Sequence, residues 1–399
     1  MNKLENKKIL LIICGGIAAY KSLQLIRLLK KGGASVKTVL TKNAKEFVTP
    51  LSVTSLSQDK VYYELFNYKN ESEMDHISLS RWADLILIAP VTANTISKLS
   101  YGLADDLATT LVLASDKTIF LAPAMNVRMW EHQSNKKNVN NLINYGYRFI
   151  GPEVGEMACG EYGEGKMTDP KNILIILENY FENLKKNKKL KVLVTAGPTQ
   201  EKIDPIRFIS NRSSGKQGYE IANCLNDNGF DTTLISGPTN LKTNRGINLI
   251  MVNTAEEMLT KCLDCLPVDI AIFTAAVGDY RAKQTFKNKI KKKDNFRLDL
   301  EKNVDILKHI SNHNSLRPKL VIGFAAETND LRKNSLKKLS EKNCDWIISN
   351  DVSNPEIGFN SEFNEVSIFY KNKNEENLPR MNKSLVANEI VNKIISDFK

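Results

Sequence analysis

The sequence predicts an α/β protein with two Rossmann-like domains, each built on a mainly parallel sheet. Two apolar runs, Ile9–Ile13 and Val192–Val194, support this prediction, because each ends in a glycine turn and is followed by a helical pattern. A charge-rich stretch without apolar periodicity separates the two halves at residues 182–189. The expected divisions are a first domain at 1–184, a solvated lysine-rich linker at 185–190 and a second domain at 191–399.

The composition is typical of globular domains. The chain has 399 residues, of which 42% are hydrophobic and 25% charged. Its longest apolar runs have the length of strands and fall short of the roughly 18 residues that suggest a membrane span. The amino-terminal residues lack the small-residue cleavage site of a secretory signal peptide. These features lead us to expect a cytoplasmic protein without a membrane segment.

The formal net charge of +11 raises the question of a nucleic-acid partner. The lysines, however, are scattered through helical patterns and the linker, with one cluster at Lys287–Lys293. No zinc-finger, helix-turn-helix or RNA-recognition pattern accompanies them. A small acidic substrate, such as a nucleotide or a phosphate ester, explains a local lysine cluster equally well. We therefore expect small-molecule substrates rather than nucleic acid.

Six cysteines are too sparse for a disulfide scaffold in a chain of this length. Cys262 and Cys265 form a C-x-x-C pattern, which can belong to a redox or metal site. No second pair and no nearby histidine accompanies them, and they fall in a helical pattern at Ala255–Leu266. We therefore expect two half-buried helix cysteines, and the metal ligands of the protein stay unassigned.

The first apolar strand leads into Gly15 and Gly16 and then into an amphipathic helix at Ser22–Lys30. The next strand, Ser35–Leu40, ends at Thr41, so the pattern predicts a right-handed βαβ unit with parallel strands. The glycine spacing does not match the G-x-G-x-x-G dinucleotide pattern. A glycine turn at a helix N-terminus still offers backbone N–H groups to one phosphate.

Polar side chains follow the next two strands. Thr92, Asn94 and Thr95 come directly after a second buried apolar run and open a helix. Open α/β sheets bind ligands at such positions, although a helix N-cap alone would also explain these residues. Asn126 follows a further strand and lies between two methionines, which is unusual for a solvated loop. Its amide could bind a carboxylate or an amide of a substrate.

His76 and Cys159 are the other candidates in the first half. A histidine at a helix start is often structural, so His76 taken alone carries little weight. Cys159 lies near the centre of Gly151–Met167, whose many glycines favour a mobile flap over a core element. A cysteine in such a flap could deliver a proton or a thiolate to a bound substrate.

Together these stretches resemble the homo-oligomeric flavin-containing cysteine decarboxylases, and specifically the phosphopantothenoylcysteine decarboxylases. The motifs that carry the resemblance are Gly-Gly-Ile-Ala at 15–18, His76, Pro-Ala-Met-Asn-Val-Arg-Met-Trp at 123–130 and the glycine-rich flap around Cys159. The resemblance implies a flavodoxin-like first domain, FMN as cofactor and a homo-oligomer. The FMN-binding residues that it implies are Gly15, Gly16, Thr41, Thr92, Asn94 and Thr95, with Gly16 standing where the family often has serine.

The resemblance also implies a reaction. FMN would oxidise the cysteinyl thiol of the substrate to a thioaldehyde, which acts as the electron sink for the loss of CO2. The resulting enethiol would then be reduced by the same flavin. In this scheme His76 acts as a base or a charge stabiliser, Asn126 binds the carboxylate or amide, and Cys159 protonates the enethiol.

The second half carries a polar segment, Asn211–Gly218, that opens a helix. Its Ser-Ser-Gly-Lys does not meet the spacing of a Walker loop, which excludes that motif. A polar helix start that contains glycine can still hold an acyl-phosphate or acyl-nucleotide. A strand at Asp269–Thr274 ends near Asp279, which is well placed for a ribose hydroxyl or a metal ion. The lysine run that follows could reach a triphosphate, and Lys338 and Lys342 lie one helical turn apart on one face.

This half resembles the phosphopantothenate–cysteine ligases over nearly its whole length. The motifs that carry the resemblance are Asp-Pro-Ile-Arg-Phe-Ile-Ser-Asn-Arg-Ser-Ser-Gly at 204–215, Ala-Ala-Val-Gly-Asp-Tyr-Arg at 275–281, Lys-Ile-Lys-Lys at 289–292 and Gly-Phe-Ala-Ala-Glu-Thr at 323–328. The family activates 4'-phosphopantothenate with CTP to an acyl-cytidylate, from which cysteine displaces CMP. The resemblance implies that Asn211 holds the acyl-cytidylate and that Mg2+ binds mainly through the CTP phosphates. The residues implied to contact CTP are Ala275, Asp279, Lys289, Asn303, Val304, Asp305, Ile306, Phe324, Lys338 and Lys342.

The two halves explain each other, because the ligase would make the phosphopantothenoylcysteine that the decarboxylase consumes. We therefore expect a bifunctional enzyme, a carboxy-lyase and an acid–amino-acid ligase, that carries out two successive steps of coenzyme A synthesis. Two other interpretations stay open: only one half is active, or the flavin domain is a regulatory binding subunit. The attached ligase half argues against the first, and the presence of His76, Asn126 and Cys159 argues against the second.

Overall fold

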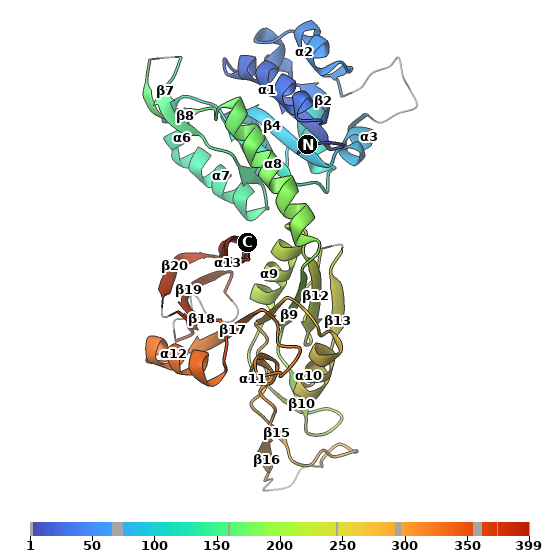
Figure 1. The fold of residues 1–399 in the computed structure, drawn as a ribbon, viewed down its shortest axis with the longest axis vertical. Helices are drawn as coiled ribbons and strands as arrows, with labels where there is room; N and C mark the ends of the chain where they lie inside the picture. Colours follow the sequence, from blue (N-terminus) through green and yellow to red (C-terminus); the bar gives the residue numbers. More distant parts are fainter. Residues whose placement is uncertain are drawn as a thin grey trace. The chain divides into compact units, whose positions relative to one another are not determined.

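The computed structural model describes residues 3–65, 75–158, 160–244, 246–291, 297–353, 361–372 and 374–398. It divides the chain into two compact units, Met1–Glu182 and Asn183–Lys399 (Figure 1). Each unit has its own sheet and its own buried core, as two separate α/β domains require.

The sheet of the first unit has six parallel strands, which confirms the predicted fold class. Across the sheet the strands are β3 (Val61–Tyr62), β2 (Ser35–Leu40), β1 (Lys8–Ile13), β4 (Leu85–Val91), β5 (Ile119–Pro123) and β6 (Arg148–Phe149). The central strands β1 and β4 are buried along their length except at the first residue of β1. Such continuous burial is typical of parallel strands that are covered on both faces.

Along the chain, the helices of the first unit alternate with its strands, and α8 begins in this unit. They are α1 (Ala19–Lys31), α2 (Pro50–Ser57), α3 (Asp75–Trp82), α4 (Ala93–Ser100), α5 (Leu107–Leu113), α6 (Val127–Glu131), α7 (Gln133–Asn144) and α8 (Pro170–Asn187), with the short 3-10 helix η1 (Lys42–Glu46). In α1 the buried residues Leu25, Ile26 and Leu29 recur at helical spacing, and this buried stripe fixes the helix on the sheet.

The strand order creates a switch point between β1 and β4. The chain leaves β1 through α1 toward β2 and later returns on the other side of β1 as β4. In open α/β sheets a ligand binds in the crevice at the carboxyl ends of such strands. The turns after β1, β2 and β4, which hold Gly15, Thr41 and Thr92, lie at this edge.

The glycine-rich segment forms a two-stranded antiparallel hairpin, β7 (Glu153–Glu156) and β8 (Tyr162–Lys166). The hairpin lies outside the main sheet and packs against α6. This placement agrees with the prediction that the segment is not a core element.

The sheet of the second unit has eight strands and is mixed. In spatial order they are β13 (Asn248–Met251), β12 (Asp231–Ser236), β9 (Lys191–Ala196), β14 (Ile270–Phe273), β17 (Leu320–Glu327), β18 (Trp346–Asp351), β19 (Phe363–Tyr370) and β20 (Glu375–Asn382). The first six are parallel, and β19 and β20 add antiparallel pairings at one edge. The helices are α9 (Lys216–Asp227), α10 (Ala255–Asp264), α11 (Ile306–Ser311), α12 (Leu331–Glu341) and α13 (Lys383–Asp397).

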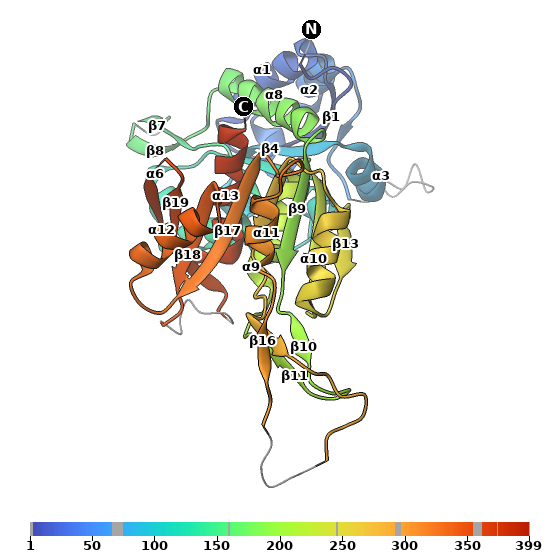
Figure 2. The same ribbon diagram turned by 60° about the horizontal axis from the view of Figure 1, so that its bottom comes forward.

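Four short strands form an arm that extends from the end of β9 beyond the sheet (Figure 2). β10 (Gln200–Lys202) pairs with β11 (Phe208–Ser210), and β15 (Tyr280–Ala282) pairs with β16 (Leu300–Lys302). The loop between β15 and β16 carries the expected CTP ligand Lys289.

The stretch expected to be a solvated linker at 185–190 is helical through Asn187, the last residue of α8, and Asn187 is buried rather than solvated. Lysine and leucine are good helix formers, so a helix can form here although the charged residues leave no apolar periodicity to indicate it. Asn187 is buried and donates from Nδ2 to Asn228 O at 2.9 Å, and Leu184 lies against Gly229. The last residues of the helix, from Asn183, therefore belong to the second unit.

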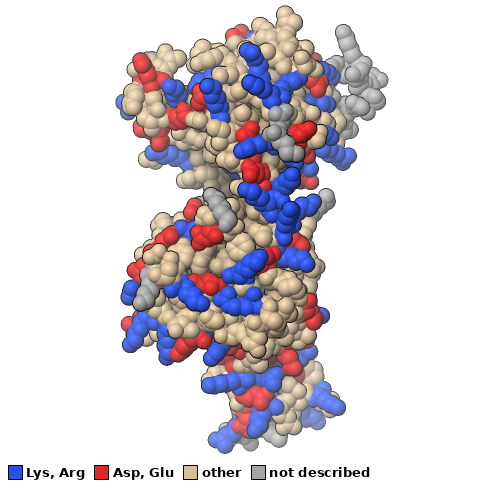
Figure 3. Space-filling view, in the orientation of Figure 1, with Lys and Arg blue, Asp and Glu red and all other residues tan. Residues whose placement is uncertain are grey.

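The surface carries both kinds of charge. On the face in Figure 3, lysine and arginine side chains are interspersed with aspartate and glutamate over much of both units. No helix in the described part of the chain is long and apolar enough to cross a membrane.

Candidate active sites

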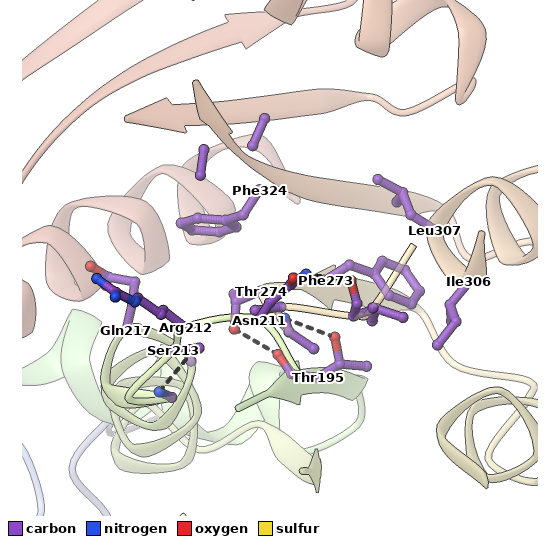
Figure 4. Close-up of a pocket in the computed structure, with 18 of the residues that line it drawn as sticks. Thr195, Asn211, Arg212, Ser213, Gln217, Phe273, Thr274, Ile306, Leu307 and Phe324 are labelled. Atoms are coloured by element: carbon purple, nitrogen blue, oxygen red, sulfur yellow. Dashed lines mark hydrogen bonds between the residues drawn. The ribbon is translucent and has the colours of Figure 1, made fainter. Parts of the chain in front are cut away.

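The second unit contains a cavity of about 520 Å3 at the carboxyl ends of β9, β14 and β17 (Figure 4). This is the switch point of its sheet, because β12 and β14 flank β9 on opposite sides. The cavity is lined by Asn211 and by most residues expected to contact CTP, which are Ala275, Asp279, Asn303, Val304, Asp305, Ile306, Phe324 and Lys342. These residues come from separate loops, and the fold brings them to one place.

Asn211 lies in the middle of the drawn lining in Figure 4. Its Nδ2 donates to Val277 O at 2.9 Å, which fixes the amide beside the end of β14. Thr274 Oγ1 donates to Thr195 O at 2.6 Å and ties the ends of β14 and β9 together. An amide held in this way keeps one N–H and its oxygen for a ligand, which suits the binding of an acyl-phosphate.

Asn303 joins two loops of the cavity wall. Its Nδ2 donates to Gly278 O at 2.8 Å, and its backbone N donates to Asp279 O at 2.9 Å. Gly278 N in turn donates to Thr199 Oγ1 at 2.9 Å. These bonds fix the backbone that carries Asp279 while its carboxylate remains exposed to the cavity.

The three expected lysines are not equivalent. Lys342 lines the cavity and pairs with Asp305, with 3.1 Å between Nζ and Oδ2. Lys338 pairs instead with Glu327, with 2.6 Å between Nζ and Oε1, and lies outside the lining. Lys289 is an exposed residue of the arm and also lies outside the lining.

The loop of Lys289 is anchored by Asp204. The buried Asp204 carboxylate accepts from the backbone N of Ile206 and of Arg207, both at 2.8 Å, and of Ile290 at 3.1 Å. Burial acts to raise the pKa of this carboxyl, but the three N–H groups and Arg207 outweigh it and hold the pKa below its usual range. The ionised carboxylate therefore stabilises the arm.

In the first unit, hydroxyl groups gather at the carboxyl end of β4. Thr92 caps α4 by accepting from Thr95 N at 3.4 Å, which confirms the N-cap interpretation. The two hydroxyl oxygens are 3.2 Å apart, and Thr95 Oγ1 lies 3.3 Å from Cys14 Sγ. Burial raises the pKa of the Cys14 thiol to about 11, so the group is a neutral hydrogen-bonding partner. Asn94 is exposed in the first turn of α4.

The turn after β1 combines a close approach with open space. A Cβ on Gly15 would lie 2.5 Å from Asn43 Cβ, whereas a Cβ on Gly16 would meet nothing within 4 Å. Thr41 closes the neighbouring turn by donating from its backbone N to Ile13 O at 3.1 Å. A tight backbone turn beside open space and hydroxyl groups fits a phosphorylated cofactor.

Asn126 is held between α6 and the hairpin. Its Oδ1 accepts from Arg128 N at 2.7 Å, so it caps α6, and its Nδ2 donates to Glu161 of the hairpin. Trp130 Nε1 donates to Glu164 Oε2 at 2.9 Å. Two hairpin carboxylates therefore bind the segment that the sequence singled out.

His76 lies in the first turn of α3 and is half-buried. Figures 1 and 2 both place α3 and the β7–β8 hairpin on opposite sides of the first unit. A single copy of the chain therefore does not bring His76 to Asn126. Cys159, the third expected catalytic residue, lies outside the described residues.

Known proteins match the chain in both halves. Residues 1–181 match the flavoprotein family, and residues 187–398 match the DNA/pantothenate metabolism flavoprotein C-terminal domain. The chain is 42% identical over 396 residues to the coenzyme A biosynthesis bifunctional protein CoaBC of Bacillus subtilis, with 98% of this chain and 97% of that protein covered. It is also 38% identical over 400 residues to CoaBC of Escherichia coli, with 99% and 98% covered. The chain belongs to the CoaBC family.

Membership of the CoaBC family confirms the predicted bifunctional enzyme. The flavoprotein half is the decarboxylase, and the carboxy-terminal half is the ligase. Both activities serve coenzyme A biosynthesis. The interpretations of a single active half and of a regulatory subunit are therefore set aside.

Two further lysines, Lys216 and Lys383, line the ligase cavity of this CoaBC protein, and neither is among the individual residues predicted from the sequence. Lys216 belongs to the quoted Ser-Ser-Gly-Lys pattern, which could have pointed to it. Lys383 begins α13, far along the chain, and nothing local distinguishes it from other surface lysines.

The C-x-x-C pattern lies in and at the end of α10, as two helix cysteines. Cys262 is fully buried, more than expected, while Cys265 is partly exposed. Burial raises the pKa of both thiols. Among the described residues, no group of three His, Cys, Asp or Glu side chains could hold a metal ion.

Proposed function

We propose that the ligase half activates 4'-phosphopantothenate with CTP and that the decarboxylase half uses FMN. The observation that carries the first part is the cavity at the switch point, which joins Asn211 to Asp279 and Lys342. At this sheet edge, the amide of Asn211 suits an acyl-phosphate and the carboxylate of Asp279 suits a ribose hydroxyl. The paired ammonium of Lys342 suits a triphosphate.

In the proposed ligase reaction, the amide of Asn211 holds the acyl-cytidylate while the amine of cysteine attacks its carbonyl carbon and CMP leaves. Asp279 accepts from a ribose hydroxyl, and Lys342 neutralises phosphate charge. The other proposed CTP contacts are Ala275, Lys289, Asn303, Val304, Asp305, Ile306, Phe324 and Lys338. We propose that Mg2+ is held mainly by the CTP phosphates, because the described residues offer no group of three ligands.

In the proposed decarboxylase site, FMN is held by the crevice residues Gly15, Gly16, Thr41, Thr92, Asn94 and Thr95. When bound, FMN supplies reversible two-electron transfer. Asn126 binds the carboxylate or amide of phosphopantothenoylcysteine, His76 acts as a base or charge stabiliser, and Cys159 donates the proton to the enethiol. The separation of α3 from Asn126 supports a homo-oligomer in which neighbouring copies complete the site.

We propose functional domains at 1–184 and 191–399, with the end of α8 between them. We also propose that the enzyme works in the cytoplasm on small molecules, without a nucleic-acid or membrane partner. The mixed surface charge in Figure 3 supports the choice of small substrates over nucleic acid.

A product assay tests this function. The protein receives phosphopantothenate, cysteine, Mg2+ and either CTP or ATP, and mass spectrometry identifies the products. We expect phosphopantetheine with CTP. Accumulation of phosphopantothenoylcysteine would contradict the flavin assignment, and no product with CTP would contradict the ligase assignment.

A further inference from the structure

Besides Lys342, the ligase cavity is lined by two further lysines, which form a second cationic region. Lys216 and Lys383 line the cavity together with Gln217, at the start of α9 and α13. Figure 4 places Gln217 at one side of the lining and Ile306 and Leu307 at the other. Lys216 precedes Gln217 in the chain, and Lys383 O accepts from Gln217 Nε2, so the backbones of both lysines lie on the Gln217 side.

Lys383 is unusual because it is 5% exposed, whereas lysines are rarely buried. Its backbone is fixed on both sides: its N donates to Glu362 O at 3.0 Å, and its O accepts from Gln217 Nε2 at 3.1 Å. Gln217 Oε1 in turn accepts from Asn364 Nδ2 at 3.1 Å. This chain of bonds sets the first turns of α9 and α13 side by side.

Charge at this end of the cavity is mostly positive. Burial, and then the neighbouring Lys216, lower the pKa of the Lys383 ammonium, while Glu362 acts in the opposite direction and offsets only part of this effect. Lys216 pairs with Glu362, but neither Glu362 nor the nearby Glu220 lines the cavity. The acidic residues that do line it, Asp279 and Asp305, belong to the loops of the other end. The positive ends of two helices add to the same field.

We propose that Lys383, together with Lys216, binds the phosphate monoester of phosphopantothenate. A dianionic phosphate at this end would face two ammonium groups and two helix N-termini, which offer charge-assisted hydrogen bonds. The triphosphate of CTP is the other phosphate in the reaction, but its proposed contact Lys342 pairs with Asp305, which precedes Ile306 on the other side of the lining in Figure 4. This assignment rests on the proposed ligase function and names the residues that distinguish phosphopantothenate from pantothenate.

The test compares Lys383→Met with Lys383→Arg in the full-length enzyme. We measure kcat/KM of ligation for phosphopantothenate and for pantothenate, and KM for CTP. Loss of a charged hydrogen-bond donor should lower the preference for the phosphorylated substrate about 10- to 100-fold in Lys383→Met, with the CTP KM unchanged. Lys383→Arg should retain much of the preference because it keeps the charge.

Lys393→Met is the matched control, because Lys393 lies on the same helix and pairs with Glu376 outside the cavity. It should leave the preference unchanged. Thermal melting shows whether each variant is folded, and the ratio of the two substrates then separates a phosphate contact from a purely structural lysine. If Lys383→Met fails to fold, Lys216→Met is measured for the same ratio.

An unchanged preference in the folded variant would overturn the proposal, and so would a rise in the CTP KM alone. Failure of the wild-type enzyme to ligate phosphopantothenate with CTP is a different result, since it contradicts the proposed function before any variant is compared. Inorganic phosphate gives a check without turnover: it should raise the melting temperature of wild type more than that of Lys383→Met.

Discussion

At the level of single residues, the amide of Asn211 donates a hydrogen bond that a carboxylate of the same shape cannot donate. Asn211→Asp loses the N–H that donates to Val277 O and places a negative charge beside the proposed acyl-phosphate. We expect the ligase rate to fall about 100-fold or more, as when one donor to a developing charge is removed. Pyrophosphate release measures this loss, and CO2 release from supplied phosphopantothenoylcysteine should stay normal. A normal ligase rate would remove Asn211 from the site.

The two glycines after β1 offer a matched pair of substitutions. Gly15→Ala forces its Cβ onto Asn43, with backbone atoms at 2.6 and 2.7 Å, so we expect overpacking that costs about 1–3 kcal/mol and loss of bound flavin. Gly16→Ser enters open space and should keep both stability and flavin. Thermal melting and flavin absorbance of the purified variants measure the two effects. Equal flavin content in both variants would show that this turn does not shape the cofactor site.

The sequence indicated which residues could contact a ligand, but only in part which of them lie together in one cavity. Asp279, Asn303 and Lys342 were assigned to one ligand, and one cavity contains all three. Lys338 was assigned with them, yet Glu327 holds it outside the lining, because a spacing of one helical turn does not say which partner each side chain meets. Lys383 gave no signal, since its burial depends on how α13 packs against α9.

At the scale of elements, the hairpin sets the position of Asn126. The backbone N of Met125 donates to Gly165 O at 3.0 Å, and Gly165 has a φ of +150°. In Gly165→Ala the new Cβ would lie 2.3 Å from Met125 O, so the segment carrying Asn126 must shift. We expect decarboxylation to fall at least about 10-fold while ligation is unchanged, because misplacing a binding group slows the chemistry.

Gly160→Ala is the control for that substitution. Gly160 also has a positive φ, +79°, but its Cβ would meet nothing within 4 Å. It should cost about 1 kcal/mol from backbone strain alone and keep most decarboxylase activity. If both variants lose activity equally, strain in the hairpin rather than contact with Met125 explains the effect.

Asp204 makes the arm sensitive to pH. Its folded pKa lies below the usual value, so its contribution to stability is present above the unfolded pKa and is lost as the pH falls through the folded pKa. Asp204→Asn should remove this dependence and loosen the loop of Lys289, since a neutral amide accepts more weakly from three N–H groups. Hydrogen exchange of the Ile290 amide at neutral pH should be faster in the variant. Exchange equal to wild type would exclude Asp204 as the anchor.

The elements themselves were largely predictable, and the exceptions have physical causes. Apolar runs such as Ile9–Ile13 mark buried parallel strands because both faces are covered. The lysine-rich end of α8 was expected to be a solvated linker, because its charged residues show no apolar period although their propensity and packing favour a helix. The antiparallel strands β19 and β20 were not expected, because their alternation of buried and exposed residues is weak in the sequence.

At the scale of the whole molecule, the two units suggest independent activities on one chain. Each sheet has a switch point of its own, and in the second unit a cavity lined by residues of that unit lies there. The proposed decarboxylase site, however, is not assembled in one copy, because His76 lies on α3 and Asn126 is bonded to the hairpin on the opposite side. A second copy that brings its α3 to the first copy's Asn126 would complete the site.

Mixing two inactive variants tests this arrangement. His76→Asn and Asn126→Ala should each abolish decarboxylation and leave ligation unchanged, which gives every sample an internal measure of folded protein. When the two chains are co-expressed, interfaces that take His76 from one variant and Asn126 from the other contain both native residues. Random assembly makes these about one quarter of all sites, so decarboxylation should recover to about a quarter of wild type. Because a site within one copy always contains one of the two substitutions, it could never recover, and zero activity in the mixed oligomer would contradict the shared site.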